Sequence, residues 1–454
     1  MRKQRTIAGT AGLVLTVVAT LALAACAPAE PVVDPDAPVT ITVSNKPPAD
    51  RAEELAAFEQ RVEEFETANP NITVEGSETV WDAQSFQALL AGGELPTTLV
   101  VPFTEPQAMI AREQVVDITE ELDAVGLTDL LNPAALTVAQ DADGAIYGVP
   151  TDAYALGLVY NRSLFEAAGL DPDVPPSTWE EVQEFAQRIT EATGVAGYAQ
   201  MTTGNTGGWI FGAVTYSNGG TLQNAEGTES TFDDDPAREQ LERLYDMRWN
   251  DNTMGSNFLY DMTSISQEYA AGRIGMFVGA PANYIFATLL NGMDADDFGM
   301  GPMPQGENAG GTMSGGAVQV VTPGATPEQR LAAAKWFAFG LEASTDEDKA
   351  VAAAETSAAA GLPVGLPGLS SLKESNYEEL LGWIKDYINV PLDNFAPYTE
   401  TVNTIALTPE PVSKAQEVYA ALDSVVQAVL TDENADIDAL LADATANVNA
   451  LLAR

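Results

Sequence analysis

The sequence predicts an α/β protein of two lobes, and three observations carry this prediction. Short apolar strand patterns at 39–43, 72–74 and 99–101 alternate with helical patterns at 51–69, 84–91 and 105–112. The 429 residues that follow residue 25 exceed what one compact core usually holds. An apolar content of 46% is enough to fill two such cores.

The first 25 residues predict a secretory signal peptide. Arg2, Lys3 and Arg5 precede an apolar run that ends Leu23-Ala24-Ala25-Cys26. These four residues resemble a bacterial lipobox, which implies that Cys26 takes lipid, palmitate included, and becomes the mature N-terminus. The alternative is a transmembrane anchor, because the run approaches the length of about 20 residues that spanning needs. Its four threonines and many alanines favour the signal peptide.

Residues 26–38 predict a spacer between that lipid and the folded body. Four prolines in this segment favour an extended polyproline conformation. No later segment reaches 18 unbroken apolar residues, so we expect the lipid to be the only membrane attachment, on the extracellular face of the cell membrane.

Charge and composition exclude several functions. Loss of the three leader cations leaves 17 basic residues against 66 acidic ones, a formal charge of −49. Such a charge opposes nucleic-acid binding and repels anionic lipid. Two explanations stay open: a cell surface that faces salty medium, where salt screens self-repulsion, or a general compositional bias.

The chain contains no histidine. Ser-His-Asp and Cys-His catalysis are therefore excluded, and ordinary zinc sites lose a usual ligand. There is no phosphate-binding G-x-x-x-x-G-K-[ST] loop, and we expect no metal and no cofactor. Asp141-Ala-Asp143-Gly144 faintly resembles a calcium loop but lacks its later ligands, so a tight hairpin turn is the preferred interpretation.

Local signals locate several helix starts. Either Ser177 with Glu180 or Thr178 with Glu181 can form a capping box. Asp235-Pro236 and Thr326-Pro327 each predict an N-cap followed by proline at the first helical position. Apolar residues spaced three or four apart predict a helical C-terminus over 410–454.

Residues 144–188 carry a resemblance to a known family. The matching pieces are Tyr147-Gly-Val-Pro150, Tyr160-Asn161, Leu164-Phe165, Ala168-Gly169-Leu170 and Thr178-Trp179. They resemble the family 1 extracellular solute-binding proteins of ABC importers, the maltose-binding-protein-like group. Further fragments follow in the family's order across about 39–450, among them Ala68-Asn69-Pro70, Gly219-Gly220 and Gly301-Pro302-Met303-Pro304.

The resemblance implies the type II periplasmic-binding-protein fold, with the ligand in a cleft between two lobes. The first lobe is expected to hold 39–150 and 281–342, and the second 151–280 and 343–454. The chain is expected to cross between lobes near Thr151-Asp152, Gly279-Ala280 and Gly340. A hinge between such lobes can close on the ligand.

A sugar site needs flat aromatic rings and polar groups that satisfy hydroxyls. We expect such residues on loops near strand ends and crossings, and a role in the core is the alternative for each. Glu105 is a further strand-end candidate. Related sugar binders often carry tryptophan at the turn that here contains Ala280-Pro281-Ala282, and this departure weakens the case for a maltose-specific site. The predicted ligand-binding residues are Asn45, Trp81, Phe103, Asp152, Tyr154, Trp209, Asn283, Tyr284, Trp383 and Tyr387.

Three functions remain in competition. The resemblance implies a monomeric, lipid-anchored receptor that delivers a sugar or oligosaccharide to an ABC permease and is not an enzyme. The same fold could instead bind a polyol, a peptide or a cation. A surface glycosidase would need two carboxylates about 5–9 Å apart across the cleft, and no motif supports it.

Some conspicuous aromatic residues are expected in the core instead of the site. They are Trp179, Trp249, Trp336 and Phe337.

Overall fold

A computed structural model describes residues 34–453 of the chain. The predicted signal peptide, the lipidation site at Cys26 and most of the linker lie outside the described residues. Among the described residues, no helix is both long enough and apolar enough to span a bilayer.

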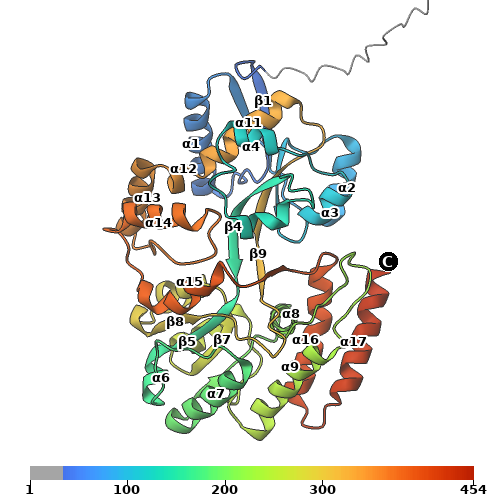
Figure 1. Cartoon of the computed structure of the whole chain (residues 1–454), viewed down its shortest axis with the longest axis vertical. Helices are drawn as coiled ribbons and strands as arrows, with labels where there is room; N and C mark the ends of the chain where they lie inside the picture. Colours follow the sequence, from blue (N-terminus) through green and yellow to red (C-terminus); the bar gives the residue numbers. More distant parts are fainter. Residues whose placement is uncertain (1–33, 454) are drawn as a thin grey trace, which may run out of the picture. The chain divides into compact units, whose positions relative to one another are not determined.

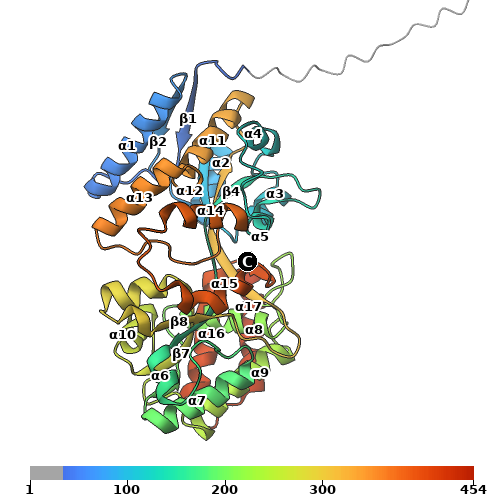
Figure 2. The same ribbon diagram turned by 60° about the vertical axis from the view of Figure 1, so that its left-hand side comes forward.

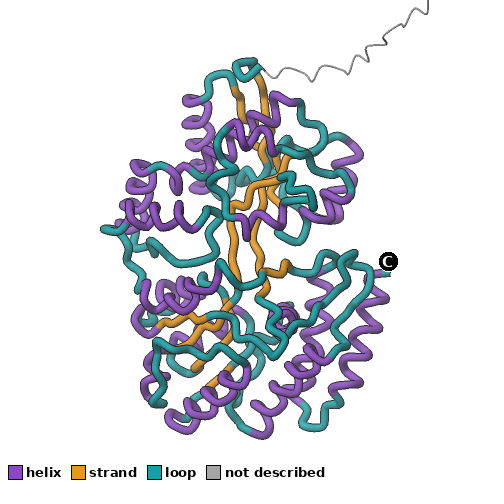
Figure 3. The backbone as a smooth tube through the Cα atoms, viewed as in Figure 1, coloured by secondary structure: helices purple, strands orange, loops and turns teal. Residues whose placement is uncertain are grey.

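Within residues 34–453, two β-sheets organise the structure (Figure 3). The larger sheet has the order β10-β9-β3-β1-β2, and β4 adds to it by pairing with β9. Its strands are β1 (Val39–Val43), β2 (Ile72–Gly76), β3 (Thr98–Pro102), β4 (Gly148–Ala155), β9 (Thr312–Val321) and β10 (Leu407–Pro409). The smaller sheet has the order β6-β7-β5-β8, with β5 (Gly157–Asn161), β6 (Ala196–Tyr198), β7 (Ile274–Gly279) and β8 (Phe298–Gly301).

Helices surround both sheets (Figure 1). Before β6 they are α1 (Ala52–Ala68), α2 (Ala83–Gly92), α3 (Pro106–Ala111), α4 (Thr119–Ala124), α5 (Pro133–Leu136), α6 (Arg162–Ala167) and α7 (Trp179–Thr193). After β6 they are α8 (Thr206–Ser217), α9 (Asp235–Tyr245), α10 (Met262–Ala270), α11 (Pro327–Gly340), α12 (Glu342–Thr345), α13 (Glu347–Ala359), α14 (Glu374–Ile384), α15 (Ala396–Val402), α16 (Ala415–Thr431) and α17 (Ile437–Leu452). The α/β prediction is confirmed.

Helix ends follow the sequence signals with one exception. Thr178 and Glu181 form the capping box of α7, and Thr326 with Gln329 forms that of α11. The predicted N-cap at Asp235 is wrong by one residue: Asp234 caps α9 by accepting from the backbone N–H of Ala237. Its extended backbone suits a cap, whereas the next residue is already helical.

Separate cores lie beside the two sheets. Ile41, Val149 and Phe337 belong to a cluster on the larger sheet, and Val101 with Phe103 belongs to a second cluster there. The largest cluster surrounds the smaller sheet and includes Trp179. The core roles expected for Trp179, Trp336 and Phe337 are confirmed, since each is at most 3% exposed, whereas Trp249 is half-buried and donates to the carbonyl of Val429. Two sheets with independent cores are what a two-lobe fold requires.

The chain passes between the sheets at places that differ from the expected boundaries. One passage is as expected, since β4 belongs to the larger sheet and β5 to the smaller one (Figure 1). The second lies between β8 and β9, because β8 pairs with β5 through Phe298 opposite Asn161. Residues 281–301 therefore lie with the smaller sheet rather than the larger.

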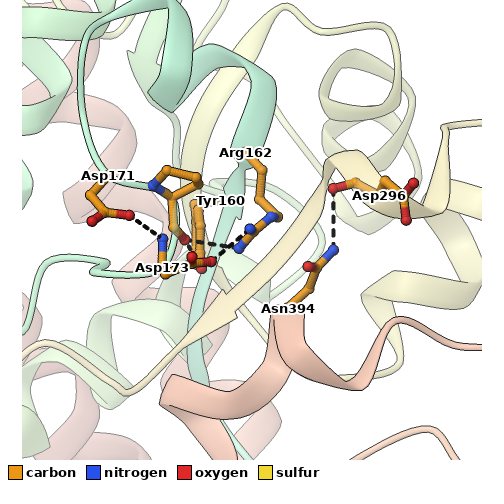
Figure 4. Close-up of polar contacts among 7 residues, drawn as sticks. Tyr160, Arg162, Asp171, Asp173, Asp296 and Asn394 are labelled. Carbon is orange, nitrogen blue, oxygen red and sulfur yellow. Dashed lines mark hydrogen bonds and ion pairs between the residues drawn. The ribbon is translucent and has the colours of Figure 1, made fainter.

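The third passage is also later than expected. Helices α12 to α14 pack near α1 and α11, and the backbone N–H of Lys373 bonds to the carbonyl of Leu130 (Figure 2). The chain reaches the smaller sheet only afterwards, where Asn394 donates to the carbonyl of Asp296 (Figure 4). In the same view Arg162 and Tyr160 bond to the carbonyl of Pro172, which fixes the loop beyond β5.

Candidate functional site

Tyr154 stands at the centre of the candidate site. It lies in β4, paired with Gly315 of β9, three residues before β5 begins in the smaller sheet. A Cβ atom at Gly315 would lie 2.2 Å from the phenol oxygen of Tyr154, so only glycine leaves room for this ring. The ring of Trp209, from α8, meets it edge to face at 6.3 Å between centroids. An aromatic ring from a strand of the larger sheet and one from helix α8 thus come together.

A carboxylate links the larger sheet to helix α16 beside these rings. The phenol of Tyr154 donates to Oε1 of Glu410 at 3.1 Å, and the phenol of Tyr419 donates to Oε2 at 2.9 Å. Glu410 follows β10, and Tyr419 lies on α16 and is 1% exposed. Burial raises the pKa of Glu410, although the two hydrogen bonds partly oppose the rise. The same burial and the adjacent carboxylate raise the pKa of Tyr154.

A pocket of about 270 Å³ opens next to this cluster. It is lined by Tyr154, Gly204, Asn205, Thr206, Trp209, Met262, Glu410, Gln416 and Tyr419. Amide, hydroxyl and carboxylate groups therefore face the same space as two aromatic rings, which is the combination that binds hydroxyl-rich molecules.

The N-terminus of α8 forms one wall of this pocket, and a buried carboxylate already occupies its amides. Asp423 of α16 accepts from the backbone N–H of Gly208 at 2.7 Å and from that of Asn205 at 2.8 Å. A Cβ at Gly208 would lie 2.2 Å from the carbonyl of Tyr419, so glycine permits α8 and α16 to approach. A helix N-terminus ordinarily attracts anions, but here the protein supplies its own.

A second pocket, of about 310 Å³, also borders Tyr154. Its walls come from β4, from the turn after β7, from the loop 366–370 and from α14. The lining residues are Asp152, Ala153, Tyr154, Ala280, Pro281, Ala282, Leu366, Pro367, Gly368, Leu369, Ser370 and Tyr377. Neither lining includes lysine or arginine, whereas Asp152 and Glu410 contribute acid.

Three predicted site residues come together here. Asp152 and Tyr154 line the second pocket, Tyr154 and Trp209 line the first, and all are at least partly exposed. Asn283 and Tyr284 lie behind the turn instead. Asn283 is 2% exposed and accepts from the N–H of Ala280, so it closes the turn. Tyr284 is 4% exposed and packs against Phe298.

The remaining predicted residues line neither pocket. Phe103 is 3% exposed in the core of the larger sheet, and Trp81 packs on Phe86 with centroids 4.7 Å apart. Asn45 is exposed with φ of 62°, a conformation that asparagine tolerates. Trp383 and Tyr387 pack with the small apolar cluster of α13 and α14. Glu105 is half-buried, and burial raises its pKa.

Sequence reasoning missed Glu410, Tyr419 and Tyr377. Tyr419 sits between Val418 and Leu422 on an apolar helix face, so its pattern predicts core. Glu410 lies 256 positions from Tyr154. The Thr-Pro-Glu-Pro sequence at 408–411 was a detectable signal, because prolines on both sides place a carboxylate on a fixed bend.

Comparisons with known proteins agree with this architecture. Residues 48–346 match the family described as bacterial extracellular solute-binding protein. The chain belongs to this family. Solved structures share its fold, among them the cyclic α-maltosyl-1,6-maltose binding protein of Arthrobacter globiformis. It is 24% identical, with a TM-score of 0.67 over 91% of this chain and 99% of that one.

Two further proteins are similar to this chain. UgpB of Mycobacterium tuberculosis, solved with glycerophosphocholine, is 18% identical, with a TM-score of 0.64 over 92% of this chain and 98% of that one. A Brucella abortus protein named as a binding protein is 27% identical over 236 residues, 49% of this chain and 54% of its own length. The chain thus spans about half the length of the curated relatives it matches first.

Proposed function

We propose that the protein is an extracytoplasmic receptor that captures a neutral, hydroxyl-rich solute, a sugar or oligosaccharide, and delivers it to an ABC import permease. The observation that carries the proposal is the junction of Tyr154, Trp209 and Glu410 beside two pockets. Aromatic rings accept the C–H faces of sugars, and carboxylate and amide groups accept or donate to hydroxyls.

The charges around the pockets narrow the ligand class. No lysine or arginine lines either pocket, and Asp423 occupies the N-terminus of α8. A phosphate or carboxylate on the ligand would therefore meet acid without a compensating cation. The glycerophosphocholine of UgpB contains a phosphate, whereas the maltose-type ligand of the Arthrobacter protein is uncharged. The pockets of this chain suit an uncharged ligand.

A cationic solute is the second candidate, because the same acidic walls favour it. Asp152 and Glu410 could face an amine or a quaternary ammonium, and aromatic rings attract such cations. The two candidates differ in salt dependence. Binding of a neutral sugar should change little with ionic strength, whereas binding of a cation should weaken as salt rises.

The location of the pockets suggests how capture proceeds. Tyr154 lies where β4 leads from one sheet to the other, and its partner Glu410 directly follows β10, which pairs with β9. In our proposal the lobes close around the ligand about these strands, and the protein acts as a monomer. The closed form offers one combined surface to the permease.

Membrane attachment through Cys26 is part of the proposal and rests on the sequence Leu23-Ala24-Ala25-Cys26. Labelling cells with radioactive palmitate tests it. The wild-type protein should take up label and sediment with membranes, whereas Cys26→Ser should do neither. Label in the Cys26→Ser variant would contradict this part.

Ligand binding is tested by melting the protein with neutral sugars, polyols, peptides and polyamines, followed by calorimetry on each hit. A ligand at 100 times its Kd should raise the free energy of unfolding by about 2.7 kcal/mol. Trp209→Ala should weaken binding about tenfold, roughly 1.4 kcal/mol, because a ring face is lost. Trp81→Ala is the matched control and should bind normally. The absence of any sugar hit, with polyamine hits abolished by salt, would replace the sugar proposal with the cationic one.

A further inference from the structure

A third pocket, of about 280 Å³, lies between α14 and α15. These helices lie one above the other in both views (Figures 1 and 2). The lining from α14 consists of Glu374, Tyr377, Glu378 and Leu381, whose spacing of three or four places them on one helix face. Glu400 is among the residues that α15 contributes. The pocket is therefore built from two helices that approach each other.

The two helices are held by different sheets. The loop before α14 is fixed to the side of the larger sheet, because the backbone N–H of Asn132 donates to the carbonyl of Ser371 at 2.8 Å. Phe395, which precedes α15, stacks on Phe298 of β8 with centroids 5.3 Å apart. The width of this pocket thus depends on how the two lobes are placed, as a cleft that closes about a hinge requires.

The third pocket adjoins the second one. Four residues line both of them: Pro367, Gly368, Ser370 and Tyr377. A Cβ atom at Gly368 would meet no atom within 4 Å, so open space lies directly beside this loop. The second pocket in turn shares Tyr154 with the first. The three pockets therefore follow one another in a row, with Tyr154 at one junction and Gly368 at the other.

Polar groups in the third pocket are free to bind a solute. Glu374, Glu378 and Glu400 are exposed, and within residues 34–453 they make no hydrogen bond or ion pair. The phenol of Tyr377 makes no hydrogen bond in that part of the chain either. The lining contains no lysine or arginine. Carboxylates beside a flat ring repeat the chemistry of the first pocket, which suits hydroxyl-rich molecules.

We infer that the three pockets form one elongated site for a linear oligosaccharide, with one sugar unit in each pocket and one end of the chain between α14 and α15. This inference rests on the proposed function. A monosaccharide fills one pocket and leaves the polar groups of the others to solvent, whereas a trisaccharide engages all three. Gly368 sets the accepted length, because a residue without a side chain leaves the passage to the third pocket open.

Gly368→Trp tests this assignment by placing a ring in that passage. The backbone of Gly368 does not have the positive φ that other residues avoid, and its Cβ position is open, so the variant should fold. Gly382→Trp is the matched control. Gly382 lies on α14 and also faces open space, but it lines none of the three pockets.

The measurement is calorimetry of the purified protein with the monosaccharide, disaccharide, trisaccharide and tetrasaccharide of the α-1,4-glucose, β-1,4-glucose and β-1,4-xylose series. In a series that binds, the wild-type affinity should rise about tenfold from disaccharide to trisaccharide. Gly368→Trp should lose this gain and bind the disaccharide as the wild type does, because the first two pockets are intact. Gly382→Trp should behave as the wild type with both.

Two exposed carboxylates provide a second test that does not depend on how the tryptophan is accommodated. Glu378→Ala and Glu400→Ala remove acceptors from α14 and α15, so each should weaken binding of the trisaccharide and leave that of the disaccharide unchanged. Glu379→Ala is their control, because Glu379 is an exposed neighbour on α14 outside the lining.

The outcomes separate this inference from the function on which it rests. Equal wild-type affinities for disaccharide and trisaccharide would overturn the elongated site and leave a sugar receptor in place. Trisaccharide binding that is unchanged in Gly368→Trp, Glu378→Ala and Glu400→Ala would do the same, as would equal losses for both sugars. Binding of no saccharide in any series would count against the proposed function itself, and the inference would fall with it.

Discussion

Replacing Tyr419 by phenylalanine tests the cluster at the centre of the candidate site. The substitution removes one phenol oxygen and nothing else from a residue that is 1% exposed. Glu410 then keeps only the donor from Tyr154, which is 3.1 Å away and half-buried. A partly buried carboxylate that loses a hydrogen bond is left with an unmet desolvation cost.

The expected loss in the free energy of unfolding of Tyr419→Phe follows from the strength of hydrogen bonds to charged groups. Such bonds contribute about 1.5–3 kcal/mol, and the half-buried position of Glu410 places the loss near the lower figure. Tyr154→Phe should cost about 0.5–1.5 kcal/mol, because solvent can partly replace its hydroxyl. Tyr245→Phe is the matched control, since its phenol donates to the carbonyl of Glu433 in an exposed setting.

Denaturant unfolding at pH 7, followed by fluorescence and by circular dichroism, measures these losses. A double-mutant cycle of Tyr419→Phe with Glu410→Gln isolates the coupling between the two side chains. We expect a coupling of about 1 kcal/mol or more. A Tyr419→Phe loss no larger than that of Tyr245→Phe, or an unchanged loss in the Glu410→Gln background, would refute the argument.

Three further predictions concern packing and charge. Gly197→Ala should lower the free energy of unfolding by about 3 kcal/mol or more, because its Cβ would lie 2.1 Å from the carbonyl of Ala186. Gly382→Ala in α14 meets open space and should raise the free energy of unfolding by about 0.5–1 kcal/mol. Chemical denaturation of the two variants measures both changes. Burial raises the pKa of Glu410, so its stability contribution is present below the ordinary value of 4.5 and is lost as pH rises through the raised value. The melting temperature of Glu410→Gln should therefore move upward relative to the wild type as pH increases, and a constant difference would contradict this sign. Finally, the chain has 66 acidic and 20 basic residues. The melting temperature of the wild type should therefore rise as sodium gluconate increases from low to moderate concentration, because salt screens the repulsion among the acidic side chains. An unchanged melting temperature would show that this repulsion does not limit stability.

Local sequence signals were enough to predict the helices and turns, because these structures depend on residues only a few positions apart. Apolar spacing predicted the buried face of α16, where Val418, Leu422 and Val426 are all buried. The Asp141 turn formed as expected, with its carboxylate accepting from the N–H groups of Asp143 and Ala145. The same reasoning misplaced the start of α9 by one residue, since two adjacent aspartates can each serve as cap and only the backbone conformation selects between them.

The candidate site was only partly predictable. Tyr154 could be nominated because the family resemblance places it at the first crossing between lobes, and Trp209 because it is an aromatic residue beside two glycines. Tyr284 satisfied a similar criterion yet lies in the core against Phe298 and Phe395. Whether an aromatic side chain lines a pocket depends on what packs against it from distant segments, and the sequence around it carries no record of that packing.

The sequence by itself determined the α/β alternation, the approximate helix starts, the absence of histidine chemistry and the acidic charge, because each depends on composition or on neighbours within a turn. Only the tertiary structure decided that β8 joins β5 and that Glu410 meets both Tyr154 and Tyr419. It also decided that Asp423 occupies the amides of α8. These contacts join residues up to 256 positions apart, and the free energy that selects them comes from burying whole faces of helices and sheets together.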